Sequence, residues 1–374
     1  MVLREWARDA HAAAEDTRAA LRHVADDPAS LTDDEWVALL GASGSQLDEL
    51  CATADSARRS VTDPDALTFV VNRNLDTTVV ASGRSDVPAL DALVDEAWRI
   101  GATEICMQGP IPDDAPADGY LRLIERVHAT APELHLHAFR PAEVRDGARR
   151  MDITVTEFLG RARDAGLGSV PGTGAQVLDD EVRAHLSGGA AAPVSAWVSS
   201  IEAAHGVGLF STATLLYGHV ETARQQVAHL RLLTEIQSRT GGFSELILMP
   251  MLPDTAPGHL AATATTAVSR RETRAVHAVA RLLTLGHFDH LQVAWTKLDR
   301  DVVEELLRGG ADDIGGLLLD GELMPGAGQE AGRVLSVDEL ADIAARVGRS
   351  PRQRTTRYTE PPADRLIPIP QVRS

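Results

Sequence analysis

Polar and ionisable side chains recur in this sequence directly after short apolar runs, where they could bind or transform a ligand. Asn72, Arg73 and Asn74 follow the run LTFVV, and Lys297 comes shortly after VAW. Such a set offers hydrogen-bond donors, a guanidinium for an anionic group and an amine able to form a Schiff base. It suits a mid-sized polar organic ligand. The candidate ligand-binding residues are Asn72, Arg73, Asn74, Gln108, His137, Thr173, Gln176, Tyr217 and His219, and the catalytic candidates are Lys297 and His219.

Several of these residues also have a structural interpretation. A buried Arg73 needs an anionic partner, which is either a ligand or an internal carboxylate such as Asp76 or Glu104. Lys297 has either a lowered pKa suited to nucleophilic chemistry or an ordinary salt bridge. The turn PGTG at 171–174 could cradle a phosphate or carboxylate at the start of the next helix. Both interpretations stay open at this point.

The histidines His135, His137 and His219 likewise have both a ligand-binding and a structural interpretation. His135 and His137 alternate on a predicted strand and therefore point to one face, as paired metal ligands would. They equally suit hydrogen-bonded histidines that line a barrel, and we predict no metal site. Tyr217 and His219 flank Gly218, so they either contact a ligand or hold a tight turn.

The elements that must position these residues follow a simple alternation. Short β-type runs alternate with longer amphipathic runs, a pattern typical of a parallel sheet with crossover helices. Eight such units predict an α/β fold of the (β/α)8 TIM-barrel type, whose chemistry sits at the carboxyl ends of the strands. The alternative is an open doubly wound sheet, but no glycine-rich dinucleotide fingerprint follows the first strand. The expected strands are 67–72, 103–107, 134–139, 168–171, 208–213, 245–250, 290–295 and 315–319.

The barrel is expected to occupy residues 67–347. Residues 1–66 read as an N-terminal helical segment, in which Thr32 followed by Glu35 has the spacing of a capping box. A further helix is expected at 46–59. Residues 348–374 contain several prolines and arginines and predict an extended C-terminal tail.

Composition restricts the partners. The 374 residues are 44% hydrophobic and 24% charged, as in an ordinary globular protein. With 36 Lys and Arg against 54 Asp and Glu, the net charge of −18 disfavours nucleic acid and membrane surfaces. No transmembrane run or signal peptide is expected. Two cysteines give no disulfide framework, and we expect a cytoplasmic protein.

A family resemblance covers the chain from about Leu31 to Tyr358. It is carried by motifs that include FVVNRN (69–74), GATEICMQG (101–109), HLHAFRPAEVRDGA (135–148), AGLGSVPGTGAQVLDDEVR (165–183) and STATLLYGHVET (211–222). The motifs resemble the second subunit of FO synthase, a radical S-adenosylmethionine (SAM) family. The resemblance implies a helix-led barrel, a [4Fe–4S] cluster, bound SAM, and synthesis of a deazaflavin chromophore from tyrosine and a diaminouracil.

The sequence departs from this family at the cluster motif. The resemblance implies three cysteines after the first strand, and their positions fall on Ala81, Ser85 and Pro88. None of these residues can supply a thiolate, which this type of cluster needs. Cys51 and Cys106 lie outside the motif. We therefore expect no iron–sulfur cluster and no other cofactor.

The SAM site departs as well. The resemblance implies a Gly-Gly pair where this chain has Gly109-Pro110, and a proline removes a backbone donor. It also implies a glutamate near SAM where this chain has Gln176, which lacks the negative charge. SAM binding is expected to be weak or absent, and radical SAM turnover is not expected.

Three functions stay open. The first is a pseudoenzyme that binds a small aromatic or flavin-like polar ligand, or modulates an active paralogous enzyme. The second is an enzyme with new non-redox chemistry in the same pocket. The third is an FO-synthase-like transferase role in deazaflavin biosynthesis. Whether the protein is an enzyme is therefore undecided from the sequence.

Overall fold

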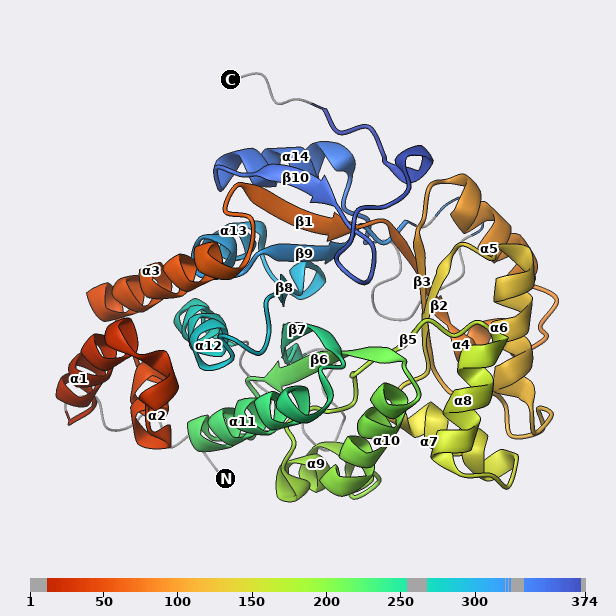
Figure 1. Ribbon diagram of the computed structural model, residues 1–374, viewed down its shortest axis with the longest axis horizontal. Helices are drawn as coiled ribbons and strands as arrows, with labels where there is room; N and C mark the ends of the chain where they lie inside the picture. The colour runs from red at the N-terminus through yellow and green to blue at the C-terminus, as the bar shows by residue number, and fades with distance from the viewer. Residues whose placement is uncertain (1–11, 254–267, 320, 322, 324–332, 371–374) are drawn as a thin grey trace.

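The computed structural model describes residues 12–253, 268–319, 321, 323 and 333–370. Residues 1–11 of the expected helical segment and 371–374 of the expected tail lie outside this range. A parallel sheet of ten strands forms a half-barrel with helices outside it, in the order β10-β1-β9-β8-β7-β6-β5-β4-β3-β2 (Figure 1). The expected α/β fold is confirmed in this coarser form.

The first strand has a special place in the sheet because it is divided in two. β1 (Ala66–Val70) pairs with β9 (Asp313–Gly316) and β10 (Ser350–Gln353), whereas β2 (Asn72–Asp76) pairs with β3 (Glu104–Gln108). Only Val71 separates the halves. The continuous segment from β1 to β2 therefore pairs with β10 at one end of the sheet and itself forms the other end as β2.

The remaining strands follow the sequence expectation. Each of the eight expected runs overlaps a strand, although the run 315–319 shares only two residues with β9. Most of β2 and all of β10 were not expected as strands, and β10 lies within the segment expected to be a tail. The other strands are β4 (His135–Ala138), β5 (Ser169–Val170), β6 (Phe210–Tyr217), β7 (Phe243–Pro250) and β8 (Leu291–Val293).

Three helices precede the sheet and pack beside it. They are α1 (Ala12–Asp26), α2 (Asp33–Leu40) and α3 (Gly44–Val61). The expected capping box begins α2, where the Thr32 hydroxyl accepts from the Glu35 backbone and Glu35 accepts from the Thr32 backbone. Helices α2 and α3 contact α11 and α12 of the barrel, so this segment covers the outside of the half-barrel (Figure 1).

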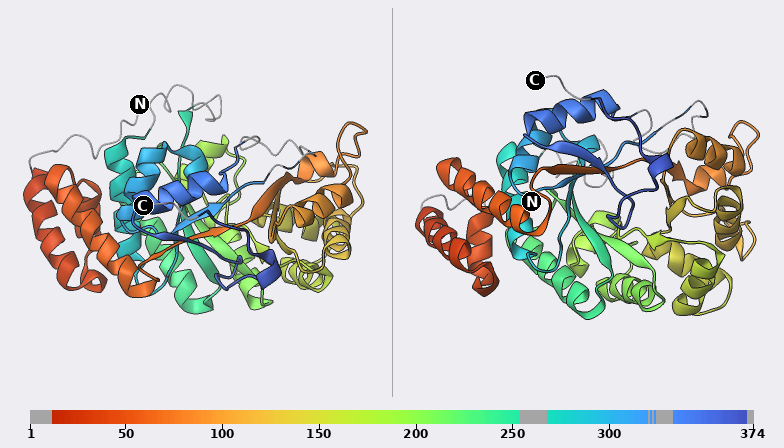
Figure 2. Two further views of the ribbon diagram at one scale, coloured as in Figure 1. Left: turned by 90° about the horizontal axis from the view of Figure 1, so that it is seen from above. Right: turned by 45° about the horizontal axis from the view of Figure 1, so that its top comes forward.

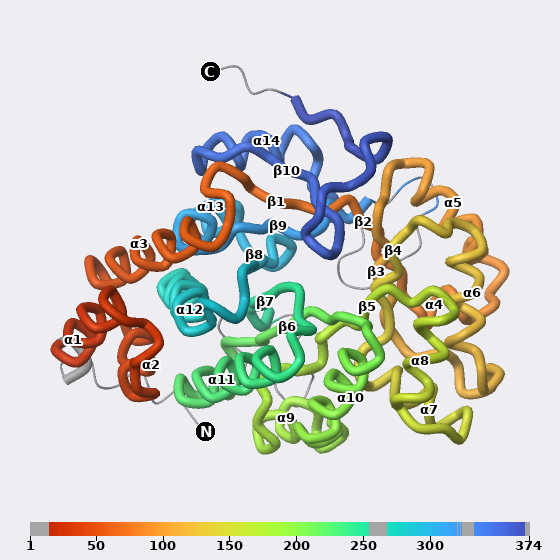
Figure 3. The backbone as a smooth tube through the Cα atoms, viewed as in Figure 1, coloured from red at the N-terminus to blue at the C-terminus, as the bar shows by residue number. Residues whose placement is uncertain are grey.

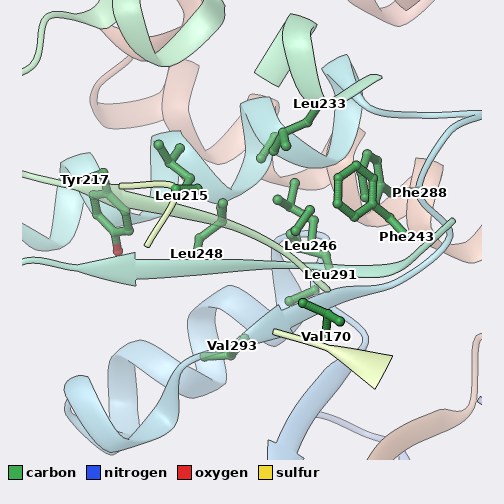
Figure 4. Close-up of a cluster of buried hydrophobic side chains, with 14 of the residues drawn as sticks. Val170, Leu215, Tyr217, Leu233, Phe243, Leu246, Leu248, Phe288, Leu291 and Val293 are labelled. Carbon is green, nitrogen blue, oxygen red and sulfur yellow. The ribbon is translucent and has the colours of Figure 1, made fainter. Parts of the chain in front are cut away.

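The other helices surround the strands, as both views of Figure 2 show. An apolar core lies between them and the sheet. Figure 4 shows part of it, where Leu215, Leu246 and Leu248 of β6 and β7 meet Leu233 of α11. The helices are α4 (Thr77–Val80), α5 (Leu90–Arg99), α6 (Gly119–Thr130), α7 (Pro141–Arg150), α8 (Val155–Ala165), α9 (Asp180–Ser187), α10 (Val194–Gly206), α11 (Ala223–Thr240), α12 (Arg270–Leu283), α13 (Arg300–Arg308) and α14 (Val337–Arg346).

The chain after β10 covers the amino ends of the strands of the half-barrel. Arg354 donates to Asp313 at 2.6 and 2.8 Å and to Glu245 at 3.1 Å. The Thr356 hydroxyl donates to Glu104 at 2.6 Å. Farther along, the C-terminal chain, blue in Figure 3, runs toward α5. There the Arg365 guanidinium lies 3.2 Å from the centre of the Trp98 ring. A segment that looks like a tail in sequence thus contributes buried contacts to the barrel.

Arg354 and its partners are buried, so they form a desolvated charge network. The Tyr358 hydroxyl donates to Glu245, and the Tyr358 ring stacks on His290 with ring centres 3.5 Å apart.

None of the helices in the described part of the chain has the length and apolar character needed to span a membrane.

Candidate functional site

A cavity of about 180 Å³ lies inside the barrel. Its lining comes from strands β1 to β4 and β6 to β9, from the turns after β5, β8 and β9, and from Arg354 and Thr356 at the amino ends of the strands. Six of the residues expected from the sequence line it together: Asn72, Asn74, Gln108, His137, Thr173 and Lys297.

Strand register explains why these side chains meet. Asn74 of β2 lies opposite Cys106 of β3, and Cys106 lies opposite His137 of β4. All three line the cavity. Because alternate residues of a strand face the same side, this row of neighbours points inward as a group.

Hydrogen bonds hold the polar wall in place. The Thr173 hydroxyl donates to Gln108 Oε1 at 2.8 Å, and Gln108 Nε2 contacts Cys106 Sγ at 3.2 Å. On the opposite side Asn72 Oδ1 accepts from the Leu318 backbone at 3.1 Å. A Cβ atom at Gly316 would lie 2.0 Å from Asn72 Oδ1, so this close approach requires glycine. The wall is therefore rigid and rich in amide groups.

His137 is neutral in this setting. Burial, followed by the nearby charge of Arg354, lowers its pKa to about 3, and burial lowers the pKa of His135 to about 4. His137 Nδ1 and His135 Nε2 lie 2.6 and 2.8 Å from the same Ser169 hydroxyl. A hydroxyl has one proton, so it donates to one ring and accepts from the other. The pair thus forms a hydrogen-bonded unit in the wall.

Arg73 does not line the cavity, although its neighbours Asn72 and Asn74 do. Its guanidinium pairs with Glu96 of α5 at 2.9 Å and donates to the Leu93 carbonyl at 3.0 Å. It also donates to the Leu323 carbonyl. The geometry matches the internal-ion-pair interpretation, with Glu96 as the partner in place of Asp76 or Glu104.

Tyr217 and His219 also lie away from the cavity. Tyr217 is fully buried within the apolar cluster of Figure 4, with its ring edge-on to His277. His219 Nε2 donates to the Leu216 carbonyl and its Nδ1 accepts from the Val220 backbone, both at 2.8 Å. These contacts match the tight-turn interpretation.

Gln176 and Thr173 line a second cavity, of about 310 Å³, outside the strand ends. Gln176 has a positive φ of 54°, and its backbone carbonyl accepts from Leu216 at 3.0 Å. Thr173 is shared between the two cavities. Thr173 therefore marks where the interior of the barrel meets this outer site.

The donor set does not fit a [4Fe–4S] cluster. Ala81 caps α4, Ser85 is exposed and Pro88 lies in the segment leading to α5. No cysteine occurs between residues 72 and 90. Cys51 is buried on α3, where burial raises its pKa, and Cys106 lies on β3. Three thiolates at one place are not available from these residues. Among the described residues, no group of three His, Cys, Asp or Glu side chains could hold a metal ion.

Sequence reasoning missed several residues of the barrel cavity. Alternation along β3 would have added Glu104 and Cys106 to Gln108, because all three face inward. Glu245 also lines the cavity, and burial raises its pKa to about 7 although Arg354 opposes the shift. Arg354 was not chosen as a candidate site residue, because its place in the cavity depends on contacts with distant strands.

Known proteins with similar sequences are FO synthases. One from Streptomyces coelicolor is 43% identical over 94% of this chain, and one from Mycobacterium leprae is 42% identical over 92%. The chain spans 42% of the length of each. The 5-amino-6-(D-ribitylamino)uracil–L-tyrosine 4-hydroxyphenyl transferase 1 of Methanosarcina mazei is 35% identical, over 83% of this chain and 86% of that protein. No family model matches the chain.

Solved structures show the same fold at low sequence identity. HydG, a maturase of the [FeFe]-hydrogenase, aligns over 93% of this chain and 79% of its own, with a TM-score of 0.65 and 13% identity. Methylornithine synthase (PylB) aligns over 89% of this chain and 97% of its own, with a TM-score of 0.63 and 14% identity.

Proposed function

The chain belongs to the FO synthase family within the radical SAM superfamily, and on that premise we propose that it is a cluster-less member. It binds one small aromatic or flavin-like polar ligand in the barrel cavity and performs no radical SAM chemistry. The observation that carries this proposal is the replacement of the three cluster thiolates by Ala81, Ser85 and Pro88.

Without those thiolates the chemistry of the family has no electron source. Reductive cleavage of SAM takes an electron from the cluster, and the cluster also chelates SAM through its open iron. The two cysteines elsewhere in the chain lie on α3 and β3 and do not restore a three-thiolate site. A ligand-binding role needs none of these groups.

The proposed weak binding of SAM has further support. Gly109 has a φ of +121°, and a Cβ atom there would lie 2.9 Å from Thr78 Oγ1, so the backbone is packed against its own chain. Pro110 removes a backbone donor directly after it. We expect SAM to bind more weakly than about 100 μM, equivalent to about −5.5 kcal/mol.

The barrel cavity supports a polar aromatic ligand. Asn74, Gln108 and Thr173 offer amide and hydroxyl groups, while Met249 and Trp295 supply apolar surface. Such a mixture of apolar walls and a few fixed polar groups is typical of small-molecule sites. A cavity of about 180 Å³ limits the enclosed part of the ligand to roughly one ring system.

A second candidate function rests on Lys297, which lines the same cavity. An amine there could attack a carbonyl substrate and form a Schiff base without any redox cofactor. Borohydride reduction in the presence of substrate would then join the substrate covalently to Lys297. A Lys297→Arg variant keeps the charge and would give no adduct.

The third candidate, a transferase role in deazaflavin synthesis, is supported by the names of the relatives alone. The chain spans about two fifths of the length of the FO synthases it matches and 86% of the M. mazei transferase. An active paralogous enzyme is the partner we propose for that case.

Small molecules released from the purified protein test the main proposal. We expect denaturation to release one aromatic or flavin-like compound in stoichiometric amount, identified by mass spectrometry. The Thr173→Val variant should bind it about fivefold to tenfold more weakly, because its hydroxyl belongs to the polar wall. Thr130→Val on the outside of α6 is the matched control, and it should change the affinity less than twofold. Release of no compound, together with no binding of tyrosine, a diaminouracil or a flavin, would overturn the proposal.

A further inference from the structure

The second cavity, outside the ends of β4 and β5, is lined by an unusual concentration of arginine. Its volume is about 310 Å³, and we call it the arginine cavity. The side chains that matter come from α7, its N-cap, the loop before α9, α9 itself and α10: Arg140, Arg145, Thr173, Gln176, Arg183 and Trp197. Three guanidinium groups at one place contrast with the net charge of −18 for the chain.

The three arginines differ in their partners. Arg140 forms a bidentate pair with Glu143, with Nε 3.0 and 2.9 Å from the two carboxylate oxygens. Its charge is therefore balanced. Arg145 has no hydrogen bond or ion pair with any described residue, although it is half-buried. One positive charge of the arginine cavity thus lacks a counter-charge in the described part of the chain.

Arg183 is held rigidly but without a salt bridge to a described carboxylate. Its Nη1 donates to the carbonyls of Gly174 and Ala175 at 2.7 Å, and its Nε donates to Ala192 at 3.1 Å. Burial lowers the pKa of Arg183, Asp180 opposes this shift, and the positive charge of Arg145 adds to it. The two guanidinium groups are therefore close enough to repel each other.

Two other polar atoms of the lining lack partners. The indole N–H of Trp197 and Oε1 of Gln176 are buried, and neither makes a hydrogen bond with a described residue. Trp197 is 2% exposed, so water outside the protein does not satisfy its N–H. An unsatisfied buried donor is costly, and native proteins usually pair such groups.

We propose that the arginine cavity binds an oxyanion, a phosphate or carboxylate group held by Arg145, Arg183 and the indole N–H of Trp197. Arginine suits both groups because its planar fork matches two oxygens at once. The cavity meets the barrel cavity at Thr173. If the proposed function holds, the oxyanion is the charged end of the ligand whose ring lies in the barrel.

Inorganic anions test this site without the ligand. We expect phosphate or acetate, whichever matches the natural group, to raise the melting temperature of the full chain above that in chloride at equal ionic strength. Calorimetry then gives the dissociation constant of that anion. The Arg145→Gln variant should weaken binding at least about tenfold, equivalent to about 1.4 kcal/mol. Trp197→Phe removes only the indole N–H from the donor set and should also weaken binding.

Arg149→Gln is the matched control, since Arg149 lies on the same helix but is exposed and paired with Asp146. It should alter the dissociation constant less than twofold. The proposal is overturned if neither anion stabilises the protein, if Arg145→Gln binds as the parent does, or if Arg149→Gln loses as much affinity as Arg145→Gln. Because these probes need no ring in the barrel, their failure is independent of the released-ligand experiment.

Discussion

Two clusters of buried polar groups at opposite ends of the half-barrel differ in whether their hydrogen bonds are satisfied. At the amino ends of the strands, Arg354, Asp313 and Glu245 satisfy one another at distances of 2.6–3.1 Å. At the carboxyl ends, Trp197 and Gln176 have buried polar atoms with no partner among the described residues. An unsatisfied buried group costs about 1–3 kcal/mol. The comparison separates residues that stabilise the fold from residues that we assign to ligand binding.

The largest effect is expected at the satisfied end. Arg354→Met leaves Asp313 and Glu245 buried without their cation, and removing one partner of a buried pair costs about 3–5 kcal/mol. The free energy of unfolding in urea measures this loss. Arg352→Met on β10, two residues before Arg354, is the control, because its pair with Asp63 is exposed and should contribute less than about 1 kcal/mol. Equal losses in both variants would contradict the assignment of the Arg354 network to stability.

Arg73 sharpens the comparison, because it lies on β2, the second half of the divided first strand, yet its side chain pairs with Glu96 of helix α5. Arg73→Met should cost about 3 kcal/mol of unfolding free energy, since Glu96 stays buried while keeping the backbone donor of Leu323. Affinity for the barrel ligand should change less than twofold. If the Arg73→Met variant is as stable as the parent but no longer binds the ligand, Arg73 belongs to the binding site and the structural assignment is wrong.

Acid should destabilise the protein through its interior histidines. Burial lowers their folded-state pKa values below the ordinary value, so the folded state binds fewer protons than the unfolded chain. The stability they give is present above about pH 6.5 and is lost as the pH falls toward their folded pKa values. The group is His135, His205 and His277, each with a pKa of about 4, and His137 and His229, each with a pKa of about 3.

Glu245 acts in the opposite direction, because its raised pKa of about 7 makes the folded state bind an extra proton as the pH falls below neutral. The contribution of this one carboxyl to the pH dependence of unfolding is smaller than the combined contribution of the five histidines. Urea unfolding at a series of pH values should therefore show a falling free energy of unfolding between pH 6.5 and 4. A constant value over that range would show that the histidines are not neutral when folded.

The smallest effect is expected at the unsatisfied end. Arg145→Gln removes a side chain with no described partner, so the free energy of unfolding should change by less than about 0.5 kcal/mol. Arg183→Gln should cost more, about 1–3 kcal/mol, because three backbone carbonyls lose their donor. If Arg145→Gln is the more destabilising of the two, Arg145 has a structural partner and the comparison between the two ends fails.

Local patterns were sufficient to predict most of the fold. β-type runs such as 245–250 became strands because their apolar residues face helices on one side and the barrel on the other. The capping box at Thr32 and Glu35 formed because it depends only on residues three positions apart. The same logic of alternation, applied to 72–74, would have turned Arg73 away from the cavity, since Asn72 and Asn74 face inward.

Contacts between distant residues were beyond that reasoning. Strand β10 and the contacts of Arg354 depend on partners far apart in sequence, such as Glu245 and Asp313. Thr356 contacts Glu104 across 252 positions. The arginine cavity is similar, because Arg145 and Trp197 come from different helices. The motif at 135–148 contains Arg145 but does not indicate which distant residues lie beside it. Tyr217 was misleading because a phenol at a strand end also fits an apolar cluster.

Iron and sulfide analysis after anaerobic reconstitution tests the central claim most directly. The protein should remain without iron or labile sulfide once excess reagent is removed, because Ala81, Ser85 and Pro88 provide no thiolate. It should also show no cluster absorbance and should not cleave SAM under reducing conditions. Four iron and four sulfide ions per chain, lost on chelation, would contradict the account and restore a radical SAM function.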